Sequence, residues 1–180
     1  ILKATGVKTF IIHARKAMLG KFTPKQNLNI PPLKYEYVYK LKEDFPKEEI
    51  IINGGITSVE EIKPQLEKTD GVMIGRAAYH TPYLLADIER EIFNNDDVPS
   101  RQDVIEQLIP YVKKELKKGT RLNQIMRHTL GLFHGQTGAS YWKRYLSENM
   151  CVRDADVKKI DHIMDKIKYN NVDTRVGQSA

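Results

Sequence analysis

Three short apolar runs, each followed directly by polar residues or glycines, constrain the fold more than any other feature of the sequence. The runs cover residues 8–12, 49–52 and 71–74, and they are rich in isoleucine and valine. Two helices are predicted between them: apolar residues recur at helical spacing within 34–45, and Ser58 with Glu61 forms a capping box that begins a helix over 58–68. Strands that alternate with helices form a parallel sheet covered by helices. We therefore predict an α/β fold for the first half of the chain.

The second half has a different character, because no strand pattern follows Pro99. We place a domain boundary within residues 95–99, so that 1–98 form the α/β part and 99–170 form a helical domain. Residues 171–180 have the polar composition of a frayed tail. The helices predicted in this half cover residues 100–118, 121–131, 139–149 and 154–169.

Composition excludes several classes of protein. Hydrophobic residues make up 41% of the 180 residues, which is enough for a core and excludes wholesale disorder. No run approaches the ~18 apolar residues of a membrane span. A single cysteine, Cys151, excludes an internal disulfide and a cysteine-based zinc site, and favours a reducing, cytoplasmic location. Apart from His13, which follows the first apolar run, the histidines lack metal-ligand spacing, so we predict no metal. They are His80, His128, His134 and His162.

The net charge of +6 is unevenly distributed. Residues 1–35 hold seven Lys or Arg and no acid, residues 36–98 hold seven against fourteen acids, and residues 99–180 hold fifteen against nine. Basic segments at both ends suit a polyanion held between two surfaces. The alternative is that these are ordinary solvated lysines on helix faces.

The residues that follow the three apolar runs form a candidate anion site. In (β/α) barrels the active site lies at the carboxyl ends of the strands, and the last two loops commonly bind phosphate. Glycines let backbone N–H groups approach a phosphate closely, and an arginine adds a bidentate charged group. The alternative is plain turns, a surface arginine and a structural histidine. The candidates are His13, Asn53, Gly54, Gly55, Gly75 and Arg76.

Cations and aromatic residues alternate in the helical half, within residues 141–145 and near Arg127. Such interleaving suits RNA, through phosphate contacts and base stacking. The alternative is an amphipathic helix with Trp142 and Tyr145 in the core, and we favour it for the aromatic residues. For the cations we favour RNA contact; these are Arg127, Lys143 and Arg144.

The order and spacing of several longer strings resemble the tRNA-dihydrouridine synthases, and most of all their bacterial A-type branch. The resemblance covers about residues 1–165, and Leu28 stands where this branch usually has an arginine. The strings are residues 13–17, 24–27, 30–33, 53–56, 71–79, 127–128, 131–133 and 142–146, together with Gly135.

This resemblance implies a fold, a reaction and roles for particular residues. The fold is the C-terminal portion of a (β/α)8 TIM barrel followed by an all-α helical-bundle domain that binds tRNA. The reaction is the FMN-dependent reduction of the C5–C6 bond of uridine 20 or 20a in the tRNA D-loop, with NADPH as reductant. His13, Asn53, Gly54 and Gly55 match flavin contacts, Gly75 and Arg76 match the phosphate turn, and Lys25 matches a tRNA contact, while Arg127, Lys143 and Arg144 lie in the tRNA-binding bundle.

The family's N-terminal strands carry a flavin-binding lysine and the catalytic cysteine, the general acid of the reaction. Neither is found here, and Cys151 lies outside the family's cysteine motif. Three strands of eight cannot close a barrel. We therefore expect the chain to be the C-terminal part of a longer synthase, inactive by itself, monomeric, and with an apolar sheet edge and face exposed.

Two other hypotheses remain open from the residues alone. The first is another flavin- or phosphate-binding barrel that acts on a small molecule, since a fold does not fix a function. The second is a non-catalytic RNA-binding module that uses only the helices.

Overall fold

The computed structural model describes residues 6–152 and 156–176, with side chains up to residue 167. The chain divides into two compact units between Ala77 and Ala78. This division by contacts lies upstream of the boundary predicted within residues 95–99, because the segment 78–94 belongs with the helices that follow it.

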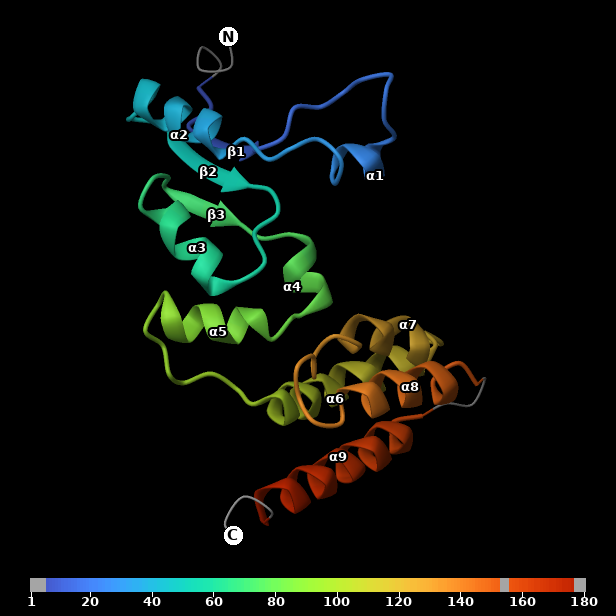
Figure 1. Ribbon diagram of the computed structural model, residues 1–180. Helices are drawn as coiled ribbons and strands as arrows, with labels where there is room; N and C mark the ends of the chain where they lie inside the picture. The colour runs from blue at the N-terminus through green and yellow to red at the C-terminus, as the bar shows by residue number, and fades with distance from the viewer. Residues whose placement is uncertain (1–5, 153–155, 177–180) are drawn as a thin grey trace. The chain divides into compact units, whose positions relative to one another are not determined.

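The first unit alternates strands and helices as predicted (Figure 1). Its described residues form a parallel sheet in the order β1-β2-β3, so the predicted α/β class with a parallel sheet is confirmed. Helix α4 begins in this unit and crosses the division between the units. The elements are β1 (Thr9–His13), α1 (Pro24–Asn27), α2 (Tyr35–Asp44), β2 (Glu49–Asn53), α3 (Val59–Leu66), β3 (Gly71–Met73) and α4 (Arg76–His80).

The strand register separates a covered face of the sheet from an open one. Ile50 and Ile52 on β2 are fully buried, with α2 packed on β2 and α3 packed on β3. Side chains alternate along a strand, so the odd-numbered residues point to the other face. There Ile11 is 56% exposed and Met73 is 39% exposed. The unit therefore has an apolar sheet face that its described residues leave open.

The second unit contains helices and no strand among its described residues. Its elements are α5 (Leu84–Glu91), α6 (Arg101–Lys117), α7 (Leu122–Met126), the 3₁₀ turn η2 (Arg127–Thr129), α8 (Ala139–Asn149) and α9 (Lys158–Val176).

Two helices of this unit begin or end at residues other than those predicted from the sequence. The helix expected over 121–131 ends at Met126, where a 3₁₀ turn follows. The last helix begins at Lys158 and continues through Val176, so the first residues of the predicted tail are helical. Residues 153–155, where that helix was expected to begin, and residues 177–180 of the tail lie outside the described residues.

Trp142 organises the core of the second unit. The side chain is fully buried, and its ring centroid lies 4.8 Å from that of Phe133. The indole Nε1 donates a hydrogen bond to the Thr129 carbonyl oxygen at 2.9 Å, which satisfies the one polar atom of the ring. The prediction that Trp142 is a core residue is confirmed, whereas Tyr145 is only partly buried against this core.

Candidate functional site

The carboxyl ends of the three strands lie side by side, as a parallel sheet requires. His13 at the end of β1 is in register with Asn53 at the end of β2, which in turn is in register with Met73 on β3. Just past the strands, the Ala14 N–H donates to the Asn53 carbonyl oxygen at 2.7 Å. The strand ends therefore bring His13 and Asn53 to one edge of the sheet.

The turn after β2 requires both of its glycines. Gly54 has φ +132° and Gly55 has φ +71°, which are conformations that other residues rarely adopt. A Cβ on Gly55 would also lie 2.6 Å from Leu33 Cδ1. The Tyr35 hydroxyl donates a hydrogen bond to the Gly54 carbonyl oxygen at 2.6 Å. This turn is therefore fixed by backbone shape and by packing from Leu33 and Tyr35.

The loop after β3 is open, in contrast to the tightly packed turn after β2. A Cβ on Gly75 would meet no atom within 4 Å, so the backbone there is open to an incoming group. Arg76 follows directly and begins α4. Its guanidinium donates hydrogen bonds to Asn29 Oδ1 and, at 3.4 Å, to the Leu28 carbonyl oxygen. Arg76 thus reaches from the end of β3 to the long loop between β1 and α2.

Arg15 approaches the same loop from the end of β1. It donates a hydrogen bond to the Pro31 carbonyl oxygen, while its Nε is buried and has no hydrogen-bond partner. Burial, followed by the positive charges of Arg15 and Arg76, holds the pKa of His13 below its ordinary value of 6.5. The strand ends therefore present an imidazole whose neutral form is favoured, with the charges of two guanidinium groups acting on it, an arrangement that favours an anion.

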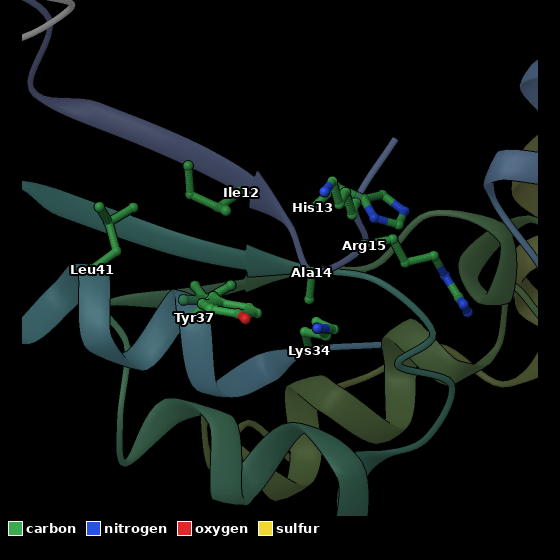
Figure 2. A pocket seen from close by; sticks show the side chains of 9 residues that line it. Ile12, His13, Ala14, Arg15, Lys34, Tyr37 and Leu41 are labelled. Carbon is green, nitrogen blue, oxygen red and sulfur yellow. The ribbon is translucent and has the colours of Figure 1, made fainter. Parts of the chain in front are cut away.

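A pocket of about 530 Å³ lies beside the end of β1. Figure 2 shows Ile12 and the end of β1 on one side of it, with Tyr37 and Leu41 of α2 on the other. His13 and Arg15 also line the pocket, but Gly54, Gly55, Gly75 and Arg76 do not. This pocket therefore lies on the flank of the sheet with both apolar and basic residues around it, and it does not contain the glycines or Arg76 of the predicted phosphate site.

The candidate RNA contacts are all exposed. Lys25 lies in α1, whose first turn is capped reciprocally by Thr23 and Gln26. Arg127 begins η2, and Lys143 and Arg144 lie on α8, directly after the buried Trp142.

One of the three candidate cations of the second unit lines a smaller pocket of about 240 Å³. Arg127 and Ser147 both line it. Lys143 and Arg144 precede Ser147 by four and three residues on α8, and residues at these spacings share a helix face. We call Arg127, Lys143 and Arg144 the basic patch.

Comparison with known proteins decides the family. A family profile described as dihydrouridine synthase (Dus) matches residues 1–168. The chain belongs to the dihydrouridine synthase family. The resemblance stated from the sequence strings is therefore confirmed.

Relatives of this dihydrouridine synthase family chain agree in name. A tRNA-dihydrouridine(20/20a) synthase of Synechocystis sp. is 46% identical over 96% of this chain and 52% of its own length. Proteins of the same name from Vibrio cholerae and Escherichia coli are 45% and 50% identical, over 93% and 86% of this chain and 51% and 47% of their own lengths. The chain thus spans about half the length of the curated relatives it matches.

Sequence reasoning about this dihydrouridine synthase family chain overlooked Arg15 as a site residue. The signal was its place in the string that follows the first strand, two residues beyond His13. The second feature that was overlooked is the engagement of Arg76 by the loop at Leu28 and Asn29, for which the sequence carries no signal.

The described residues offer neither a metal site nor a membrane-spanning helix. They contain no cluster of three or more His, Cys, Asp or Glu able to hold a metal ion. They also contain no helix that is both long and apolar enough to cross a membrane. Cys151, two residues beyond the end of α8, is exposed and accepts a hydrogen bond from Asn123 Nδ2 at 3.8 Å.

Proposed function

We propose that the chain forms the flavin-facing edge and the tRNA-binding helices of an FMN-dependent tRNA-dihydrouridine synthase of the 20/20a type. The reaction would saturate the C5–C6 bond of a uridine in the D-loop. The observation that carries this proposal is the pair of guanidinium groups, Arg15 and Arg76, beside the neutral His13 at the carboxyl ends of parallel strands. Family membership and the names of the relatives support it.

The residues at the strand ends fit a flavin mononucleotide. The orphaned Arg15 Nε is a buried donor in need of an acceptor, and the open backbone at Gly75 leaves room for a phosphate. In this proposal Gly75 and Arg76 bind the phosphate, while His13, Asn53, Gly54 and Gly55 contact the rest of the cofactor. Bound there, FMN would supply the hydride that reduces the uracil ring, with NADPH restoring it.

The side chains of this chain would prepare the site in three ways. Burial, and then the positive charges of Arg15 and Arg76, lower the pKa of His13 and so favour the neutral ring, which can donate or accept a hydrogen bond. Arg76 offers a permanently charged donor set that a phosphate would compete for against Leu28 and Asn29. The rigid turn at Gly54 and Gly55 would keep backbone groups at a constant distance from the ring.

The basic patch would hold the tRNA backbone, and Lys25 would add a contact from the loop after β1. Cations that contact phosphates give affinity and position without reading the sequence. A base inside a folded tRNA is inaccessible, so the target uridine must leave its stack to reach the flavin. We therefore expect the RNA contacts to orient the tRNA while the strand ends receive one base.

The open sheet face supports the proposal that further strands complete this site. Ile11 and Met73 would lie inside a closed barrel, where such residues pack in layers. The general-acid cysteine of the family would come from those strands. We therefore propose that the chain by itself does not catalyse the reaction, and that it works as a monomer in the cytoplasm.

The test supplies the remaining strands by co-expressing the chain with the N-terminal half of the Synechocystis relative. Purified protein should show the visible spectrum of bound flavin, and Arg76→Ala should lower its FMN affinity about tenfold or more, as loss of a charged hydrogen bond implies. Lys68→Ala is the matched control, because Lys68 precedes β3 and lies at the amino end of the sheet.

A colourless protein that takes up no added FMN would overturn the flavoenzyme proposal. An equal loss in Lys68→Ala would show that positive charge in general, and not the site, sets the affinity.

A further inference from the structure

Tyr79, His128 and Arg127 form a hydrogen-bonded row on the surface of the second unit. The Tyr79 hydroxyl lies 2.9 Å from His128 Nδ1, and Arg127 Nε donates to His128 Nε2 at 3.2 Å. The Tyr79 and His128 rings meet edge to face, with centroids 5.8 Å apart. All three side chains are exposed, so burial in a core does not explain their arrangement.

The chemistry of the donors fixes the state of the histidine. An arginine Nε–H only donates, so His128 Nε2 must be the unprotonated acceptor. The proton of the neutral ring then sits on Nδ1, where it is donated to the Tyr79 oxygen. Arg127 therefore selects the tautomer of His128, and the Tyr79 oxygen, which can donate or accept, holds the ring by accepting from Nδ1.

Tight packing holds the two ends of this row together. Tyr79 belongs to α4, and a Cβ on Gly131, just beyond η2, would lie 1.9 Å from the His80 carbonyl oxygen. Only a glycine permits the backbone of α4 to come so close to the chain after η2. The Tyr79–His128 contact is therefore made between two backbone segments that touch.

The row affects how Arg127 presents its charge. Its Nε–H is taken by His128, which leaves both terminal amino groups for an external acceptor. A long side chain loses rotamer freedom when it binds, and this entropy loss lowers the affinity. The loss is smaller when the side chain is already ordered in the free protein. Because the bond from Nε to His128 already restricts the Arg127 side chain, less entropy is lost when its guanidinium binds an acceptor.

We propose that His128, held in place by its hydrogen bond to Tyr79, is a positioning residue that orients Arg127 toward an RNA phosphate. This inference rests on the proposed function, in which Arg127 belongs to the RNA-binding basic patch. It assigns roles to His128 and Tyr79 that act through Arg127 and not through direct contact with RNA.

Two substitutions of His128 separate its two ring nitrogens. In His128→Gln, the side-chain oxygen can stand near the position of Nε2 and accept from Arg127. In His128→Asn, the shorter amide stands near Nδ1, so it keeps the bond to Tyr79 and loses the one to Arg127. The readout is the affinity of the full 180-residue chain for an unmodified tRNA transcript at one fixed salt concentration.

We expect His128→Asn to weaken tRNA binding by roughly two- to tenfold, the range set by immobilising one long side chain. His128→Gln should restore affinity to within about twofold of the parent. Tyr79→Phe removes the acceptor of the Nδ1 proton, so the ring is held less firmly and binding should also weaken, which provides a second variant if His128→Asn unfolds. In an Arg127→Ala background, none of these changes should have a further effect.

The outcomes distinguish this inference from the proposed function. If Arg127→Ala leaves tRNA affinity unchanged, the RNA contact itself is wrong. If Arg127→Ala weakens binding but His128→Asn does not, or if the two losses are additive, the positioning role is overturned. Thermal unfolding of each variant confirms that it is folded.

Discussion

The hydroxyl of Tyr35 donates a hydrogen bond to the carbonyl oxygen of Gly54 at 2.6 Å, which joins the first turn of α2 to the turn after β2. Burial is the largest of the causes that raise the pKa of Tyr35, so the hydroxyl keeps its proton and remains a donor. The helix that covers the sheet and the turn that would face the cofactor are therefore connected by one bond.

Removing that hydroxyl should loosen the turn without disturbing the core. Tyr35→Phe should lower the free energy of unfolding by about 1 kcal/mol, the usual net value of one hydrogen bond. Urea denaturation of the chain measures it. Tyr37→Phe is the control, because Tyr37 lies two residues further along α2 and is 63% exposed. Equal stability of Tyr35→Phe and the parent would contradict a structural role for the bond.

The two glycine turns should respond differently to alanine. Gly55→Ala requires a left-handed residue to carry a Cβ within 2.6 Å of Leu33, so it should cost about 1–2 kcal/mol from conformation alone, and more from the clash. Gly75→Ala meets open space and should leave the midpoint of thermal unfolding nearly unchanged. In the co-expressed protein, however, Gly75→Ala should lower FMN affinity. Normal FMN binding by that variant would show that the Gly75 backbone does not contribute to the phosphate site.

His13 reports on its cationic neighbours. Because the positive charge of Arg76 helps to lower the pKa of His13, Arg76→Ala should raise that pKa. It should not return to 6.5, because burial is the larger cause and remains. Proton NMR of the imidazole during a pH titration measures it. An unchanged His13 titration in Arg76→Ala would show that the two side chains do not interact, and Lys68→Ala serves as the control.

Asp70 makes the stability of the first unit depend on acidity. Its carboxylate accepts from the Ile50 N–H at 2.8 Å and from Lys42 Nζ at 2.6 Å, and these bonds lower its pKa from the ordinary 3.8. A lowered carboxyl pKa stabilises the fold above the ordinary value, and this contribution is lost as the pH falls through the folded-state value. Asp70→Asn should therefore show a flatter loss of stability below about pH 4 in urea titrations. Identical acid profiles would rule out this role for Asp70.

Much of the fold followed from local signals. The predicted strand at 49–52 ends one residue later, at Asn53, because its pairing with His13 continues to the strand end. The helix predicted over 139–149 has those bounds, since Trp142 and Leu146 mark its buried face. Such elements have a periodicity that any window of the sequence reveals.

Tertiary contacts decided the elements that were mispredicted. The helix expected to reach residue 131 ends early, because the Thr129 carbonyl oxygen accepts from the Leu132 N–H and from the Trp142 indole, which no local pattern announces. Gly131 must also pass against the His80 carbonyl. Helix α5 went unpredicted because Tyr83, at its N-cap, makes no side-chain capping bond.

The candidate site divides in the same way. The order of strand ends placed His13 and Asn53 together, because register in a parallel sheet follows from topology. The approach of Arg15 and Arg76 to the loop at residues 28–31 depends on how that loop folds back, which its sequence does not encode in any short pattern.

The two ends of the loop between β1 and α2 are hydrogen-bonded to each other. Arg15 forms an antiparallel bridge with Leu33, and the Lys34 N–H donates to the Ala14 carbonyl oxygen at 2.7 Å. A loop closed at its base can change length at little entropic cost, since that cost grows only logarithmically. The part of the loop that carries Lys25 can therefore change in length or sequence without altering the residues at the strand ends.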